Sequence, residues 1–267
     1  MRKRGVILLA MLIVAVVGGI GWLVLRPREP VYEGKTLSEW LDGDVRSPSP
    51  SSWMIAAKQS KNAVVQMGTN AIPWLLLRLR AKDSSPLMDK LVALAQKLHL
   101  YKVKARLPAR IRRAQGENGF LALGAEGKSA VPELIVMYEQ KSLRECRESV
   151  ANALGSIGPA AKAAVPAIVR GLSDMDEVDS NYAAKALGRI HAEPELAVPA
   201  LVNCLNHHYF LLRQNAARAL TRFGAEAKPA VPTFVKLLSD PDQEVKQMAK
   251  DALAKIDPEA LAWAGVK

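Results

Sequence analysis

The stretch VPAIVRGL at residues 165–172 decides the fold, because near copies follow it as VPALVNCL at 198–205 and VPTFVKLL at 231–238. A proline in the first turn of a helix loses no hydrogen bond, since the leading N–H groups have no acceptor within the helix. Each copy therefore predicts a helix that begins near its Val-Pro pair. We also expect the proline to bias the preceding valine away from α geometry and so to help end the helix before it.

A second motif precedes these copies and keeps the same 33-residue phase. It reads VANALGSI (150–157), AAKALGRI (183–190), AARALTRF (216–223) and AKDALAKI (249–256). The chain thus alternates two kinds of short helix, and a degenerate first unit is visible at residues 63–79. Such a fixed period is typical of a solenoid, in which each repeat packs only on its neighbours.

The alternation resembles the HEAT-like repeats, especially the short bacterial type called bilin-lyase HEAT-like, over about residues 53–257. The resemblance implies an α-solenoid and, more often than an enzyme subunit, a protein-binding scaffold. We therefore predict an all-α fold: a HEAT-like α-solenoid of about five to six helix pairs, preceded by a single transmembrane helix. The repeat domain is placed at residues 53–267, with a basic insertion at about 83–113.

The N-terminus predicts a membrane anchor. MRKR is followed by residues 5–25, which carry no charge and are long enough as a helix to cross a bilayer. We assign residues 1–28 to a basic N-terminus and transmembrane anchor, and 29–52 to a linker with a short helix. The excess of Lys and Arg before the apolar run predicts that the N-terminus lies in the cytoplasm. In a bacterium the repeats would then lie on the outer side of the inner membrane. A cleaved signal peptide remains the alternative.

The basic insertion is the first candidate for partner binding. Residues 97–113 contain seven Lys or Arg and no acid, although the formal net charge of the whole chain is only +11. An anionic membrane or cell-envelope polymer, an acidic protein partner and a merely solvated insertion all remain open, and nucleic acid is disfavoured because the other repeats are not basic. The residues selected here are Lys102, Lys104, Arg106, Arg110, Arg112 and Arg113.

Residues in equal phase form the second candidate, because equal phase in a solenoid becomes a row in space. Arg170, Asn203 and Lys236 share one phase of the second helix, and we expect this row to lie on the concave face and to contact a partner. Arg189, Arg222 and Lys255 share one phase of the first helix and are interpreted as solvent-facing positions.

The sequence contains no pattern that predicts catalysis. It lacks a nucleophile elbow, a phosphate-binding glycine loop, HExxH and CxxC, so no catalytic, cofactor-binding or metal residue and no cofactor is predicted. The period places His207, near Cys204 and His208, in a turn rather than in a metal site. The acidic residues 174–179 are interpreted as a capped turn rather than a calcium loop. Cys146 and Cys204 are expected to be packed free thiols.

Local signals complete the predictions. Thr36 with Glu39, Asp174 with Glu177, and Asp240 with Gln243 are spaced as capping boxes. The terminal stretch 258–265 is expected to cap the solenoid through Trp263.

We predict a membrane-anchored scaffold that binds an unidentified protein and does not catalyse a reaction; a small-molecule substrate is not expected. The first alternative is an accessory or lyase-type enzyme that uses Cys204 or His191. The second alternative is polyanion or nucleic-acid binding through residues 97–113.

Overall fold

The chain begins, in the part that the structure describes, with a hairpin and a helix. The computed structural model describes residues 29–45, 50–83, 90, 107–174 and 176–264. Strands β1 (Val31–Tyr32) and β2 (Lys35–Thr36) pair antiparallel and lead into helix α2 (Leu37–Val45). Thr36 and Glu39 form the predicted capping box, since the Glu39 carboxylate accepts the Thr36 N–H at 2.8 Å and the Thr36 hydroxyl accepts the Glu39 N–H.

Six helix pairs follow within the described residues, so the predicted all-α solenoid is confirmed. The first helices of the pairs, called A helices, are α3 (Pro50–Met67), α6 (Ala109–Leu123), α8 (Arg147–Ile157), α10 (Glu177–Ile190), α12 (Phe210–Phe223) and α14 (Gln243–Ile256). The second, called B helices, are α4 (Ile72–Leu79), α7 (Val131–Glu139), α9 (Val165–Asp174), α11 (Pro194–Cys204), α13 (Val231–Leu237) and α15 (Pro258–Trp263). Short 3₁₀ segments link several A helices to their B helices: η1 (Gly68–Ala71), η2 (Gly124–Ala130), η4 (Gly158–Ala164) and η5 (Gly224–Ala230), while η3 (Lys141–Cys146) joins α7 to α8.

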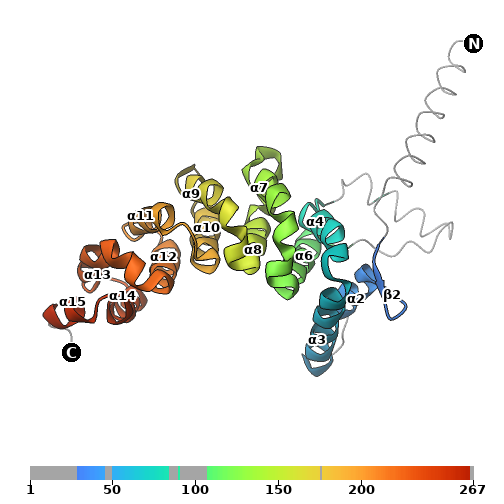
Figure 1. Cartoon of the computed structure of the whole chain (residues 1–267), viewed down its shortest axis with the longest axis horizontal. Helices are drawn as coiled ribbons and strands as arrows, with labels where there is room; N and C mark the ends of the chain where they lie inside the picture. Colours follow the sequence, from blue (N-terminus) through green and yellow to red (C-terminus); the bar gives the residue numbers. More distant parts are fainter. Residues whose placement is uncertain (1–28, 46–49, 84–89, 91–106, 175, 265–267) are drawn as a thin grey trace, which may run out of the picture.

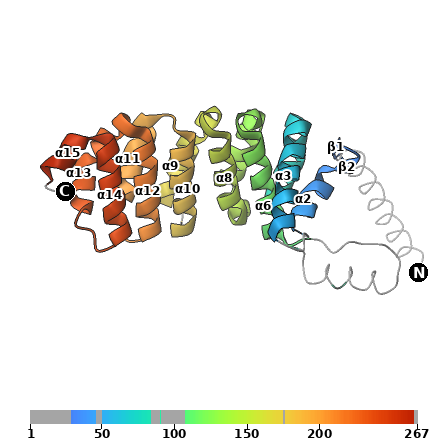
Figure 2. The same cartoon turned by 90° about the horizontal axis from the view of Figure 1, so that it is seen from below.

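The two kinds of helix form two layers of an arc. In Figure 1 the ends of the arc bend toward the A helices, and Figure 2 shows these helices side by side. Neighbouring A helices also contact each other more extensively than neighbouring B helices do. The A helices therefore form the concave face, and the prediction that the second helices line it is wrong. Buried alanines such as Ala183, Ala186 and Ala216 explain the difference, because small side chains let A helices approach closely.

Glycines with positive φ, rather than the prolines, end most A helices. Gly124, Gly158 and Gly224 adopt φ of 54°, 69° and 54° at the same phase of three repeats, a backbone that a side chain would strain. His191 takes this place after α10 in the left-handed conformation, with φ of 48°. The chain thus turns where its backbone is least restricted.

The prolines mark the B helices as predicted, but they do not act on the valines before them. Val131, Val165 and Val231 all have right-handed helical angles, so the expected bias away from α geometry is wrong. Each proline sits at the second helical position, where its missing N–H has no intrahelical acceptor to lose. Pro199 differs and lies inside α11, because that helix begins earlier, at Pro194.

Two of the predicted caps are displaced by two residues. The N-cap of α10 is Asp176, whose side chain accepts the Asp179 N–H at 2.9 Å, and the N-cap of α14 is Asp242, which accepts the Val245 N–H at 3.1 Å. Asp240 instead accepts the Asp242 N–H at 2.8 Å and stabilises the turn ahead of the cap. The acidic stretch is nevertheless a capped turn, as predicted.

The core is a continuous layer between the A and B helices. The leucines of the second motif, Leu154, Leu187, Leu220 and Leu253, are fully buried. Cys146 and Cys204 are buried free thiols, as predicted. Trp263 is 90% exposed, so the prediction that it closes the last pair is wrong; Ala260 and Leu261 of α15 pack on the core instead, because they face α14.

The predicted membrane helix needs a correction. Within the described ranges no helix combines the length and the apolar character needed to cross a bilayer. Even α3, which has 18 residues, carries the exposed charges Lys58 and Lys61. The segment predicted to span the membrane, residues 5–25, lies outside the described residues. The fold class is therefore corrected to an all-α solenoid without an assigned transmembrane helix, and the inner-membrane localisation with an extracytoplasmic repeat domain is withdrawn.

Candidate partner-binding surface

The predicted row on the second helices lies on the convex layer. Arg170, Asn203 and Lys236 are all exposed on the B helices α9, α11 and α13. The Arg170 guanidinium forms an ion pair with Glu139 of the preceding B helix, so its charge is already matched. These residues lie on successive B helices, as equal phase requires, and the B helices form the layer away from the concave face.

Two arginines of the basic insertion have contacts that hold the fold together. Arg112 is buried, and its guanidinium donates to the carbonyls of Leu107 at 2.9 Å and Lys82 at 2.8 Å. Arg113 donates to the Ala81 carbonyl at 2.9 Å. Both side chains thereby connect the start of α6 to the residues that follow α4. Because Arg112 is buried by these contacts, it has little surface left for a partner.

The remaining residues of that segment divide into two groups. Arg110 is exposed and lines a groove on the A-helix face. Lys102, Lys104 and Arg106 lie outside the described residues.

The groove that contains Arg110 has mixed charge. It has a volume of about 640 Å³, lies between α3, α6 and α8, and is lined by two arginines, Arg110 and Arg113, and by Glu117, Glu145 and Glu148. We call it the mixed groove.

Glu117 is the half-buried acid of the mixed groove. Its carboxylate accepts hydrogen bonds from the Ser149 hydroxyl at 2.5 Å and the Asn152 amide at 3.0 Å. Burial raises the pKa of Glu117, because a carboxylate loses its hydration there.

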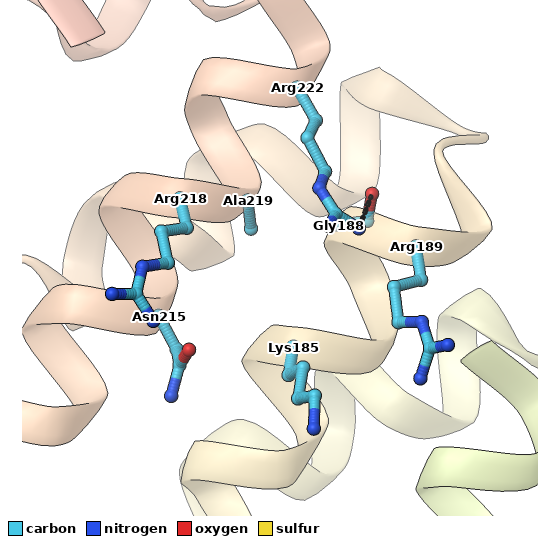
Figure 3. Close-up of a pocket in the computed structure, with 7 residues that line it drawn as sticks. All are labelled: Lys185, Gly188, Arg189, Asn215, Arg218, Ala219 and Arg222. Carbon is cyan, nitrogen blue, oxygen red and sulfur yellow. Dashed lines mark hydrogen bonds between the residues drawn. The ribbon is translucent and has the colours of Figure 1, made fainter. Parts of the chain in front are cut away.

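A second groove on the same face is basic. It lies between α10 and α12 and has a volume of about 340 Å³. We call it the basic groove, and it is lined by Lys185, Gly188, Arg189, Asn215, Arg218, Ala219 and Arg222. Figure 3 shows Lys185 and Arg189 on one helix and Arg218 and Arg222 on the next. Sequence reasoning noted the equal phase of Arg189 and Arg222 but assigned them no role.

Within the part of the chain that the structure describes, none of the four cations of the basic groove forms an ion pair, although the charge of Lys185 acts on the Glu117 carboxylate from a longer distance. The Arg222 guanidinium makes one long contact to the Gly188 carbonyl, at 3.5 Å. The Lys185 ammonium lies 6.0 Å from the centre of the Tyr182 ring. Three of the four side chains are exposed and Arg189 is half-buried, so their charges are available to a ligand.

The floor of the basic groove depends on one glycine. A Cβ atom added to Gly188 would lie 2.6 Å from the Cα atom of Ala219, closer than packed atoms come. The missing side chain lets α12 approach α10 at this point. The same device recurs one repeat earlier, where a Cβ on Gly155 would lie 3.2 Å from the Cα of Ala186.

A different set of arginines lies at the starts of the A helices. Arg113, Arg147 and Arg213 share one phase, and each donates to a carbonyl at or just beyond the end of the preceding B helix. Each also lies near an acid of the next repeat: Arg113 at 3.9 Å from Glu145, Arg147 at 3.5 Å from Asp179, and Arg213 at 3.3 Å from Asp240. We call these residues the paired arginine row. The equal phase of these arginines is visible in the sequence. Their partners could not be predicted, because the path of each turn decides which carbonyl and which acid come near.

The candidate catalytic residues have structural surroundings. Cys204 is buried, and burial raises the pKa of its thiol to about 11, which keeps the thiolate scarce at neutral pH. His191 takes the turn position of a glycine, and its ring lies 5.0 Å from that of Phe223. His207 Nδ1 accepts the Tyr209 N–H at 3.1 Å, which fits the predicted turn. Over the described residues no three His, Cys, Asp or Glu side chains come together as metal ligands.

Comparisons with known proteins support the fold. A family profile described as HEAT repeats matches residues 198–263. An engineered protein of known structure is 17% identical, with a TM-score of 0.52, over 84% of this chain and 99% of its own. No curated protein matches the chain. The fold is therefore a HEAT/armadillo-like repeat solenoid, and the finer assignment to the bilin-lyase type has no support.

Two designed armadillo repeat proteins are also similar. One is 16% identical with a TM-score of 0.49, over 83% of this chain and all of its own. The other, solved in complex with the peptide (KR)4, is 15% identical with a TM-score of 0.48, over 84% of this chain and all of its own.

Proposed function

We propose that this chain is a protein-interaction scaffold that binds a segment of a partner protein along the concave A-helix face, without catalysis of its own. The observation that carries the proposal is that both polar grooves described above, the mixed groove and the basic groove, lie on this face. Solenoids of stacked helices present extended concave surfaces of this kind to their partners.

The distribution of matched and unmatched charge supports the choice of face. Charges that stabilise the repeats are paired, as in the paired arginine row, whereas the three arginines of the basic groove form no ion pair with an acid among the described residues. Arg170 on the B helices is matched by Glu139. An unmatched cluster on a concave surface favours binding, because clustered like charges repel one another in the free protein.

Site-specific photo-crosslinking in cells of the source organism tests the proposal. A photoreactive amino acid is placed at Asn118, which is exposed in the mixed groove, or at Val136, which is exposed on the B helix α7. We expect Asn118 to capture one partner protein in stoichiometric yield and Val136 to capture none. Capture from Val136 alone, or from neither position, would contradict the proposal.

The lyase-type enzyme is the weaker candidate. It needs a reactive thiol or imidazole, and Cys204 is buried with a raised pKa. We expect Cys204→Ala to leave partner capture from Asn118 unchanged. Loss of a chromophore-transfer activity in this variant would favour the enzyme instead.

Polyanion binding through residues 97–113 stays an alternative, in which Arg112 and Arg113 would take little part because backbone carbonyls engage them. We expect charge reversal at Lys102, Lys104 and Arg106 to leave capture from Asn118 unchanged. Loss of both capture and heparin retention in this variant would restore the basic segment as the binding site.

A further inference from the structure

The basic groove is the surface that lacks a structural explanation. Lys185, Arg189, Arg218 and Arg222 line one hollow of about 340 Å³, and its other lining residues, Gly188, Asn215 and Ala219, are uncharged. Lys255 continues the phase of Arg189 and Arg222 on the next A helix and is exposed. Such a cluster is repulsive in the free protein, so an anionic ligand would relieve it.

The chemistry of the groove disfavours nucleic acid. Its lining contains no aromatic side chain on which a base could stack. The mixed groove presents Glu117, Glu145 and Glu148 on the same face, and these would repel any polyanion, a phosphate backbone or a long acidic peptide, that continued along the arc. The ligand must carry its negative charge locally.

We infer that the basic groove binds an acidic, extended segment of the partner protein, rich in Asp or Glu. This inference deepens the proposed function by naming the chemistry of the partner. Planar guanidinium groups hold carboxylates through two parallel hydrogen bonds, and three of the four cations are arginines.

The spacing of the groove suits an extended chain. Packed helices lie about 8–10 Å apart, so cations in equal phase on α10 and α12 are presented at roughly that interval. An extended strand places side chains of one face about 7 Å apart, within the reach of long arginine side chains. Asn215 donates to Asn181 on the neighbouring helix and holds the two walls together beside the cations.

Fluorescence anisotropy with a defined peptide tests the inference. The probe is a labelled peptide of about ten residues that alternates Glu and Ser, roughly 33 Å long when extended. We expect the full chain to bind it, and binding to weaken as salt rises from about 0.05 M to about 0.5 M, because salt screens exposed charges. Arg189→Glu with Arg222→Glu is expected to weaken binding about 10- to 100-fold.

A matched control separates the groove from overall charge. Lys128→Glu with Lys228→Glu changes the net charge equally at exposed positions in η2 and η5, outside the groove. We expect this control to change the affinity less than about threefold. Equal losses in both double variants, or no loss in the groove variant, would overturn the inference. If the charge reversals unfold the protein, Lys185→Gln with Arg218→Gln decides the question by the same measurement.

Two further outcomes are decisive. An oligothymidylate of about ten nucleotides that binds more tightly than the peptide, and depends on Arg189 and Arg222, would assign the groove to single-stranded nucleic acid and overturn the inference. If the groove variants bind the peptide as tightly as the natural chain while Asn118 still captures a partner, the acidic segment is rejected and the scaffold function stands. Absence of capture would reject the scaffold itself.

Discussion

The arginines at the starts of the A helices and those of the basic groove differ in what they contact. In the paired arginine row, Arg113, Arg147 and Arg213 have side chains only 15%, 13% and 11% exposed, with carbonyl and carboxylate partners. In the basic groove, Arg218 and Arg222 are exposed and have no acidic partner among the described residues. The same residue type thus joins successive repeats at one end of the A helices and remains available to a ligand on the concave face.

The largest loss of folding stability is expected for a substitution in the paired arginine row. Arg213→Met removes the donor to the carbonyls of His207 and His208 and leaves the Asp240 carboxylate, only 8% exposed, without its counter-ion. Breaking a buried pair in this way should lower the free energy of unfolding by about 3 kcal/mol. Urea denaturation measures this change in the free energy of unfolding. Adding Asp240→Asn should recover part of the loss, and a loss below about 1 kcal/mol in the single variant would contradict a buried pair.

The second largest loss of stability is expected for a substitution at Gly188, in the floor of the basic groove. Gly188→Ala places a methyl group against Ala219, at 2.6 Å from its Cα before any relaxation. Overpacking of this kind should cost about 1–3 kcal/mol in thermal unfolding. Gly155→Ala is the matched control, because its nearest contact is 3.2 Å, and it should cost less. Equal costs would mean that the A helices do not approach closest at the groove.

The pH dependence of stability tests the acid of the mixed groove. Burial raises the pKa of Glu117 above 4.5 in the folded state, so the contribution of Glu117 to stability is greatest below pH 4.5 and is lost as pH rises through the folded pKa. Glu117→Gln stays neutral, and the variant should therefore gain stability relative to the natural chain over that window. Denaturation at a series of pH values measures the difference. A difference that is constant with pH would show that Glu117 does not ionise within the window.

The smallest effect on stability is expected in the basic groove. Arg218→Met removes an exposed charge with no recorded acidic partner among the described residues, so the free energy of unfolding should change by less than about 0.5 kcal/mol. The same substitution at Arg213 provides the comparison. A destabilisation by Arg218→Met as large as that by Arg213→Met would abolish the distinction between the two sets.

The repeat architecture could be predicted from the sequence because it depends on local, periodic signals. The Val-Pro pairs and the Ala-Leu pairs mark helix starts and buried faces directly, and the turn glycines keep the same phase. The helix caps were misplaced by two residues because the turns offer several acids. Asp240 has the spacing of a capping box with Gln243 and Asp242 does not, yet the path of the turn selects Asp242.

The functional surface could not be predicted in the same way, because it depends on which helix layer is concave. The direction of curvature follows from how closely neighbouring helices pack, which involves pairs of small residues such as Gly188 and Ala219 on different repeats. The phase that unites Arg189 and Arg222 is visible in the sequence. That Arg189 and Arg222 belong to the concave A helices, while Arg170 and Lys236 belong to the convex B helices, emerges only from the packed layers.

The glycine-to-alanine contacts between A helices also set the spacing of side chains along the concave face. Gly155 against Ala186 and Gly188 against Ala219 are corresponding contacts one repeat apart, the second closer than the first, so α8, α10 and α12 are held at short and similar separations. Side chains of equal phase are consequently presented at similar intervals along this part of the arc. Inserting one further copy of the α10–α11 repeat would lengthen the row of cations by one step without altering that interval, and the length of acidic chain that fits would increase accordingly.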